Sequence, residues 1–276
     1  LQVAALLPPT AAGQPVGKGD LVLVTGGARG IVFECVLELA RRTGCRLLLT
    51  GRTELPMGRP AWLGTPPAQI DAVIREMEIR LVKEEGKKLP EAKRIGALAR
   101  AQWELSRNLD AMEAAGIEGR YERCDVSDAK AFAALLRQLR AGREIVRGVV
   151  HGAGIQKSKL VTELTDEAIA ATARTKLDPV FTMLDALDWS QVRLFSSFGS
   201  IAGLFGNAGQ SDYGLANDLL AWLTTEIGAL HRHVKAQTVE WTAWTGAGMV
   251  TEEEGKRFAE VGLTPLDVRT GVRLYA

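Results

Sequence analysis

The sequence is short of cysteine, net charge and long apolar runs, and each shortage excludes a class of protein. Its three cysteines, Cys35, Cys45 and Cys124, are odd in number and form no CxxC pair, so we expect buried, reduced thiols. A formal net charge of +1 gives no attraction for nucleic acid or an anionic membrane. No apolar run approaches the roughly 18 residues that cross a bilayer, and no signal peptide is visible. We therefore expect a cytoplasmic protein.

The length of 276 residues and the apolar content of 46% predict one large domain with a substantial core. Residues 1–19 are rich in proline and glycine, a composition typical of a linker, so the domain is expected at 20–276. The chain begins with Leu1 rather than methionine, and we expect it to be a piece excised from something longer.

A strand, a glycine turn and a helix open the predicted domain. Leu21–Thr25 is a β-rich apolar run, and an apolar-periodic segment follows from Ile31 to Arg42. Glycines between them let the backbone approach a pyrophosphate, and the helix N-terminus favours its charge. A merely structural turn is the alternative. The residues predicted to contact a dinucleotide here are Thr25, Gly26, Gly27, Arg29, Gly30 and Ile31.

A second strand, Cys45–Gly51, ends at Arg52. An enzyme that uses NAD usually carries an acidic residue at this place to bind the ribose 2′-hydroxyl, whereas arginine suits a 2′-phosphate. NADPH is therefore the expected cofactor, with Arg29 as a second contact. The alternative is that Arg52 is a solvated residue at a strand end with no ligand. Glu54 is close enough in sequence that NAD is not excluded as the cofactor.

The chain between Arg52 and Gly119 is far longer than a crossover requires. We expect two or three helices, the last from about Ile95 to Ala115 being the crossover and residues 56–95 an insertion. Either a solvated excursion or a docking surface for a neighbouring domain fits its mixed charges.

Four more segments alternate with helical patterns and predict strands at 120–124, 145–151, 192–196 and 234–241. A helix from Thr165 is expected to kink or end at Pro179. Residues 251–260 predict a charged lid helix and 265–276 the start of another. The expected fold is α/β, a Rossmann-type doubly wound parallel sheet with a helical insertion after the second strand.

The segment from Leu194 to Asn217 carries the chemistry. Ser200 lies thirteen residues before Tyr213, and Asn217 follows four residues after it, on the same face of a predicted helix. A phenol with a pKa near 10 acts as an acid near neutrality only if a nearby cation stabilises the phenolate. The chain must therefore supply a lysine.

This spacing resembles the short-chain dehydrogenase/reductase superfamily, in which a Tyr-x-x-x-Lys pair follows the serine. Here Asn217 stands where most members carry the lysine. The ketoreductase domains of type I polyketide synthases and related fatty-acid synthases exchange the two residues, and Lys176 stands 24 residues before Ser200, where that branch has its lysine. TGGARGI, HGAGIQKSKL and GNAGQSDY most resemble ketoreductases of polyunsaturated fatty acid synthases and iterative polyketide synthases.

The resemblance implies reduction of a β-ketone. Tyr213 would give its proton to the ketone oxygen and Ser200 a hydrogen bond, although Ser196 and Ser197 are also near. Lys176 would lower the pKa of Tyr213 and hold the nicotinamide ribose, and Asn217 would position Lys176 or a water.

Further cofactor contacts are implied by matching motifs. They are Asp125 and Val126 beside the adenine, Gly152 and Ala153 beneath the nicotinamide ribose, and Trp241 and Thr242 near the nicotinamide. A helix-capping Asp125 and a core corner of tryptophans are the alternatives. Val32 replaces the last glycine of the family turn, so looser or differently shaped helix packing is expected. His151 is expected to be structural, and no metal site is expected at His231 and His233.

The substrate implied is a β-ketoacyl thioester on the phosphopantetheine arm of an acyl carrier protein, with other domains of the same synthase as partners. Lys157 and Lys159 would meet the arm or the carrier protein's acidic face. The alternatives are an inactive structural or cofactor-sensing domain and a free-standing reductase of small ketones. The family closes its sheet with a seventh strand, which we do not expect here.

Overall fold

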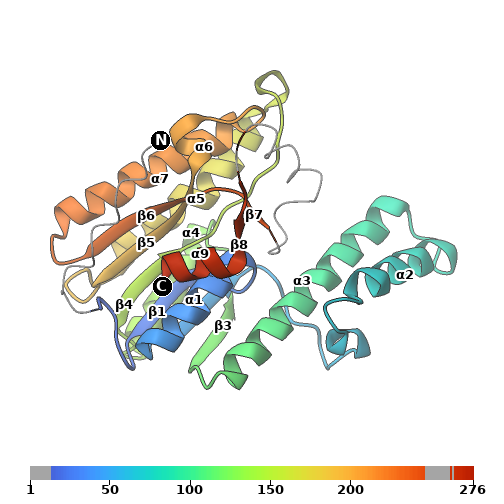
Figure 1. The fold of residues 1–276 in the computed structure, drawn as a ribbon, viewed down its shortest axis with the longest axis horizontal. Helices are drawn as coiled ribbons and strands as arrows, with labels where there is room; N and C mark the ends of the chain where they lie inside the picture. The colour runs from blue at the N-terminus through green and yellow to red at the C-terminus, as the bar shows by residue number, and fades with distance from the viewer. Residues whose placement is uncertain (1–13, 246–261, 263) are drawn as a thin grey trace.

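The computed structural model describes residues 14–245, 262 and 264–276. Its centre is a six-stranded parallel sheet in the order β3-β2-β1-β4-β5-β6 (Figure 1). The strands are β1 (Leu21–Thr25), β2 (Arg46–Gly51), β3 (Gly119–Arg123), β4 (Val146–His151), β5 (Leu194–Ser200) and β6 (Lys235–Trp241). The strand order reverses between β1 and β4, as in a Rossmann sheet, so the predicted fold is confirmed.

Helices cover both faces of the sheet. Residues of α1, α3 and α9 belong to the hydrophobic cluster on one face, and residues of α4, α5 and α7 belong to the cluster on the other. The bounds are α1 (Gly30–Thr43), α3 (Leu89–Ala114), α4 (Ala129–Ala141), α5 (Asp166–Ala186), α6 (Ile201–Phe205), α7 (Ser211–Leu230) and α9 (Val268–Tyr275). A second, two-stranded sheet joins β7 (Trp244–Thr245) to β8 (Leu266–Asp267).

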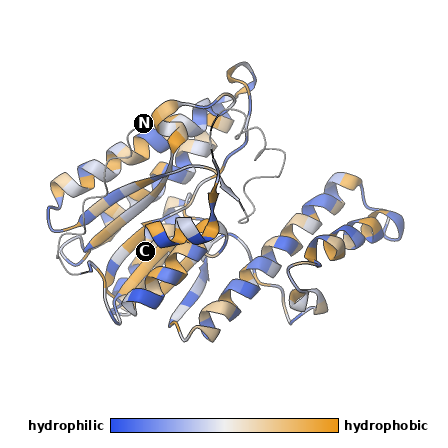
Figure 2. Ribbon diagram, viewed as in Figure 1, coloured by the Kyte–Doolittle hydropathy of each residue, from blue (hydrophilic) through white to orange (hydrophobic). Residues whose placement is uncertain are grey.

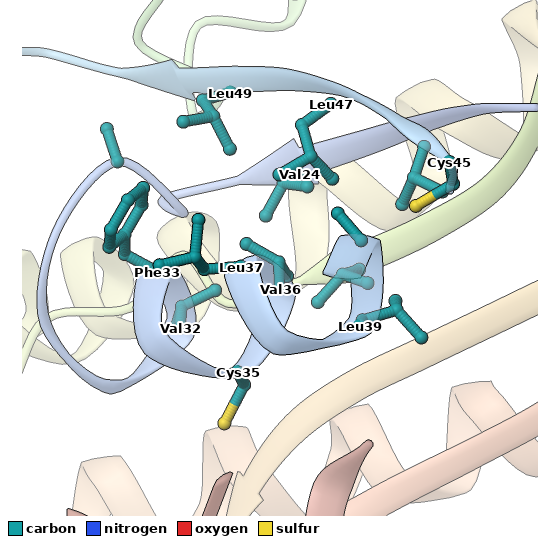
Figure 3. Packing of buried hydrophobic residues seen from close by; sticks show 14 of the residues in the cluster. Val24, Val32, Phe33, Cys35, Val36, Leu37, Leu39, Cys45, Leu47 and Leu49 are labelled. Atoms are coloured by element: carbon teal, nitrogen blue, oxygen red, sulfur yellow. The ribbon is translucent and has the colours of Figure 1, made fainter. Parts of the chain in front are cut away.

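The central strands β1, β2 and β4 are buried on both sides of the sheet because their residues are mostly apolar. Side chains of β1 alternate between the two clusters, with Val22 and Val24 on the α1 side and Leu21 and Leu23 on the other. Figure 3 shows Val36 of α1 pointing toward Val24. In Figure 2 apolar residues follow the central strands, whereas the outer helices mix polar and apolar residues. In the described part of the chain, no helix has the length and apolarity of a membrane span.

The helical insertion forms an arm that projects away from the sheet (Figure 1). It comprises the short helix η1 (Ala61–Gly64), α2 (Ile70–Lys83) and the N-terminal half of α3, and a small cluster of Ile70, Ile74, Ala99 and Trp103 holds it together. The expected start of the crossover helix at Ile95 is wrong, because α3 begins at Leu89 and continues through Gly96. A Cβ on Gly96 would lie 2.3 Å from the Glu78 carboxylate, so this glycine permits close helix packing.

Three further expectations are corrected. Val16 is fully buried in the core, so the predicted linker ends before it. Pro179 does not end α5, because the helix is packed between α4 and α7 and continues to Ala186. The strand expected at 192–196 ends later than predicted, because β5 continues to Ser200. The charged helix expected at 251–260 lies outside the described residues.

Candidate active site

The glycine turn after β1 lies directly against the turn after β4. Gly26 has a φ of +67°, and a Cβ there would lie 2.8 Å from Cα of Ala153. A Cβ on Gly152 would lie 2.5 Å from a methyl group of Val32. Gly152 thus provides the space that Val32 needs. Gly152, which follows β4, thus compensates for the family glycine that Val32 replaces. The start of α1 therefore still packs tightly against the turn after β4.

A pocket of about 490 Å³ lies between the end of β3 and helix α4, and Arg52, Asp125 and Leu135 are among the residues that line it. The Asp125 carboxylate accepts hydrogen bonds from the backbone N–H and hydroxyl of Ser127, but the N-cap of α4 is Asp128, so the helix-capping alternative for Asp125 is wrong. Glu54 is paired with Arg123 at 2.9 Å. Arg123 lines the same pocket as the exposed Arg52, so both an acidic and a basic side chain lie near this site.

His151 has a structural role, as expected. Its Nδ1 lies 2.5 Å from the Thr25 hydroxyl and its Nε2 lies 2.9 Å from the Lys176 carbonyl oxygen. Because that carbonyl only accepts, Nε2 carries the proton and Thr25 donates to Nδ1. Burial, followed by the charge of Lys176, lowers the His151 pKa to about 4. The neutral ring joins the end of β1 to α5.

Lys176 extends from α5 into the interior, where only 3% of the residue is exposed. Its ammonium donates a hydrogen bond to the Phe198 carbonyl at 2.6 Å. A Cβ on Gly154 would lie 2.9 Å from its Cε, so the ammonium lies beside the turn after β4. Burial lowers the Lys176 pKa to about 8, and the Glu240 carboxylate opposes that shift.

Tyr213 lies in the first turn of α7, which begins at Ser211 after a Gly209 with φ +74°. Burial raises the pKa of the phenol, while hydrogen bonds from Asn217 and Ser200 lower it and Glu240 raises it. Lys176 is not among the groups that shift this pKa, and its ammonium donates to the Phe198 carbonyl oxygen, so the expected lowering by Lys176 stays a prediction. A raised pKa makes the phenol a weaker acid, so donation of its proton requires a cation that stabilises the phenolate.

Asn217 is fully buried one helical turn beyond Tyr213. Its Nδ2 donates to the Tyr213 carbonyl oxygen at 2.7 Å, and its Oδ1 is buried with no hydrogen-bond partner among the described residues. An unpaired buried acceptor is costly, so this atom is suited to a donor that arrives with a ligand or a water.

The helices that carry the lysine and the tyrosine are fastened together next to these residues. The Thr172 hydroxyl donates to the Asp212 carboxylate at 2.7 Å, and both side chains are buried. Thr172 lies one turn before Lys176, and Asp212 immediately precedes Tyr213. This contact fixes the position of α5 relative to α7, which a lysine acting from a separate helix requires.

Three serines lie on β5, and their contacts distinguish them. The Ser197 hydroxyl lies 2.9 Å from that of Thr224 and 2.8 Å from that of Thr238, and Ser196 accepts from Tyr275. Ser200 is half-buried and accepts the Ala202 N–H at 3.2 Å, which leaves its hydroxyl proton for another acceptor.

Replacing Ser200 and Ser197 separately with alanine is expected to separate catalysis from stability. Ser200→Ala should lower kcat about a hundredfold, because a hydrogen bond to the developing oxyanion is lost. Ser197→Ala should leave kcat within about threefold but reduce the free energy of unfolding by about 1 to 2 kcal/mol, because buried hydroxyls lose partners. Steady-state kinetics and thermal unfolding check both, and a larger loss of kcat in Ser197→Ala would identify the wrong serine.

Glu240 is a site residue that the sequence did not reveal. It lies on β6 opposite Gly199 of β5, and a Cβ on Gly199 would lie 2.4 Å from its carboxylate. One carboxylate oxygen is buried without a hydrogen-bond partner in the part of the chain that the structure describes. Burial raises the Glu240 pKa, whereas the Ser200 N–H and the charge of Lys176 lower it. In the sequence, Glu240 is recognisable only as a charged residue near the end of the strand predicted at 234–241.

Trp241 and Trp244 form a core corner, one of the two expectations for them. Both are buried, and their rings pack edge to face with centroids 4.8 Å apart. Phe198 and Tyr275 complete this aromatic cluster. Thr242, which follows Trp241 in the chain, is half-buried, and the rest of the implied nicotinamide segment, from residue 246 on, falls outside the described residues.

The remaining polar candidates have structural contacts. His231 stacks on Trp189 at 4.9 Å, and His233 lies 2.9 Å from the Trp189 carbonyl oxygen. The three cysteines are buried, free thiols whose pKa values burial raises, as expected.

The predicted residues thus gather in two places along the carboxyl edge of the sheet. Lys176, Ser200, Tyr213 and Asn217 surround the ends of β4 and β5. The glycine turn, Arg52 and Asp125 lie at the ends of β1, β2 and β3. Ligands of doubly wound sheets bind at this edge, where the strand order reverses.

The KR domain family matches residues 21–246 of the chain. Among curated proteins, a polyunsaturated fatty acid synthase protein of Thraustochytrium sp. is 32% identical over 270 residues, 94% of this chain and 9% of the relative. Polyketide synthase PksN of Bacillus subtilis is 25% identical over 258 residues, 91% of this chain and 4% of the relative. The chain spans about a tenth or less of the length of these two relatives.

Solved structures agree with this fold. A ketoreductase domain from the bacillaene assembly line has a TM-score of 0.69 and 24% identity, covering 95% of this chain and 54% of that one. The ketoreductase from the first module of phoslactomycin biosynthesis in Streptomyces sp. HK803 has a TM-score of 0.69 and 25% identity, covering 94% and 49%. The chain belongs to the KR domain family, oxidoreductases with the short-chain dehydrogenase/reductase fold.

Proposed function

We propose that this chain uses NADPH to reduce a β-ketoacyl thioester, held on an acyl carrier protein, to the β-hydroxyacyl thioester. The observation that carries the proposal is the position of Lys176, whose ammonium lies beside Gly154 and Phe198 at the same sheet edge as Ser200 and Tyr213. An inactive domain does not explain why a buried charge is kept there. Burying an ammonium is costly unless its charge is used.

The residues at the sheet edge fit a dinucleotide. Because Gly26 has no side chain, the turn after β1 packs directly against the turn after β4. A pyrophosphate would lie against the turn after β1, at the start of α1. Arg52 lines the pocket beside β3 and would pair with a 2′-phosphate. Lys176, beside Gly154, would hold the nicotinamide ribose hydroxyls. When bound, NADPH supplies the hydride for the carbonyl carbon.

The chain's own groups handle the proton and the developing charge. Tyr213, whose phenol is protonated at neutral pH, donates its proton to the carbonyl oxygen, and Ser200 donates a hydrogen bond to the same atom. A cationic Lys176 stabilises the resulting phenolate by its charge. The Asn217 Oδ1, buried and without a partner among the described residues, accepts a hydrogen bond from the donor that returns a proton to Tyr213.

The acyl carrier protein is proposed to approach over the loop that follows β4. Lys157 and Lys159 are exposed there, and the Lys159 N–H donates to the Gly209 carbonyl oxygen at 2.9 Å, just before α7. An acidic carrier surface would be attracted to these lysines, and the thioester would then reach Tyr213. Other domains of a synthase would present the carrier.

Replacing Glu240 with glutamine is expected to move the alkaline limb of the kcat profile to lower pH. Activity requires cationic Lys176, whose pKa is about 8, so turnover falls as pH rises through that value. The Glu240 carboxylate raises the Lys176 pKa, and its removal therefore lets the ammonium lose its proton at lower pH. The matched control is Glu226→Gln, an exposed carboxylate of α7. An unmoved limb in Glu240→Gln would remove Glu240 from this role.

The proposed function is tested by following NADPH and NADH consumption with a β-ketoacyl pantetheine thioester. We expect turnover with NADPH and a higher kcat/KM than with NADH, because only NADPH carries the phosphate for Arg52. Turnover of small ketones but not of the thioester would favour the free-standing reductase. Binding of NADPH with no turnover of any ketone would favour the inactive domain.

A further inference from the structure

Helix α1 begins without a cap of its own. Its N-cap residue is Arg29, which makes no side-chain capping bond within the described residues, and the first turn holds no acidic residue. The first N–H groups of a helix have no partner within it. Here the Gly30 N–H donates to Oε1 of Glu104 at 2.9 Å, 74 residues away in the middle of α3. A carboxylate from another helix therefore supplies the anion at this N-terminus.

Glu104 also engages the cation of the same turn. Its Oε2 lies 3.8 Å from Nη1 of Arg29, with both side chains partly exposed. One carboxylate thus contacts both a backbone N–H and the guanidinium that a dinucleotide phosphate would use at this turn. The Glu104 carboxylate oxygens thus make the contacts with Gly30 and Arg29 that phosphate oxygens would make.

The position of Glu104 is fixed by its neighbour in α3. Asn108, one helical turn further on, is 2% exposed, and its Nδ2 donates to the Ala28 carbonyl oxygen at 3.1 Å. This buried bond holds α3 against the glycine turn. The Glu104 carboxylate is therefore presented to Gly30 by a helix that is anchored beside it.

We propose that Glu104 competes internally for the phosphate site and thereby sets the affinity of the turn for a pyrophosphate-containing dinucleotide. A phosphate that takes the Gly30 N–H must displace the carboxylate, and the two negative charges repel each other at short range. The identity of the dinucleotide rests on the proposed function, whereas the competition for an anion does not.

A purely structural role for Glu104 gives the opposite result. If the carboxylate only fastened α3 to the turn, its loss would loosen the turn and weaken binding of every anion. If it competes, its loss strengthens binding. The direction of the change in dissociation constant therefore separates the two roles.

The test variant is Glu104→Gln, which keeps an oxygen for the Gly30 N–H and removes the charge. We expect the dissociation constants of NADPH and NADH, measured by fluorescence titration, to fall about three- to tenfold. The matched control is Glu113→Gln, an exposed carboxylate of the same helix, which should leave both constants within about 1.5-fold of the native values.

Inorganic pyrophosphate, titrated by calorimetry, is the second probe, and Glu104→Gln should bind it more tightly than the native chain. Unchanged or weaker binding of both pyrophosphate and NADPH in Glu104→Gln would overturn the proposal. A third outcome is that Glu104→Gln binds pyrophosphate more tightly than the native chain while neither of these two proteins binds NADPH. That outcome would support the competition and contradict the proposed function. Thermal unfolding confirms that each variant is folded.

Discussion

Replacing Tyr213 with phenylalanine is expected to lower kcat about a thousandfold while leaving the NADPH dissociation constant within about twofold. The reason is that phenylalanine keeps the ring but cannot donate the proton, and general acid catalysis of this kind contributes about 10²- to 10⁴-fold. Stopped-flow kinetics for kcat and fluorescence titration for NADPH binding measure the two quantities separately.

The matched control is Tyr275→Phe. That hydroxyl is buried and donates to Ser196, away from the proposed acid, so its loss should lower the melting temperature and leave kcat within about threefold. If Tyr213→Phe kept more than about a tenth of native turnover, the phenol would not be the acid.

Replacing Lys176 with methionine is expected to lower kcat at least about a hundredfold and to weaken NADPH binding as well. Methionine fills the same buried space beside Gly154 but supplies neither the cation for the phenolate nor donors for the ribose. Removing the ammonium relieves its desolvation but leaves the Phe198 carbonyl without its donor, so the two effects offset each other and the melting temperature should change little. Loss of activity without loss of stability is the expected signature.

Lys130→Met serves as the control, because Lys130 is an exposed lysine of α4 and should affect none of these quantities. Native turnover in Lys176→Met would show that the tyrosine works without this cation. Lower stability together with lower activity would instead identify Lys176 as a structural residue.

Local sequence patterns predicted the fold because they match the environment that each element occupies. Leu21–Thr25 is apolar throughout since its strand is buried on both faces, and the glycine turn follows from the close approach of Gly26 to Ala153. The extension of β5 to Ser200 was missed, because its serines and glycine have low strand propensity and are held by pairing with β6. Tertiary packing likewise explains why α5 continues past Pro179.

Candidate site residues were predictable where a motif fixes their spacing. Tyr213 and Asn217 share one helix, whereas Lys176 required the family resemblance because it comes from another helix. Glu240 and Glu104 could not be predicted. Each acts through a partner distant in sequence, Lys176 for one and Gly30 for the other, and only the folded chain brings them together.

The most direct measurement of the central claim follows the hydride itself. The chain is incubated with a β-ketoacyl thioester and NADPH deuterated at the transferred position, and mass spectrometry locates the label in the product. We predict one deuterium on the carbon that bears the new hydroxyl, at a rate that Tyr213→Phe reduces about a thousandfold. A native chain that binds NADPH and the thioester but leaves the product without deuterium would contradict the account.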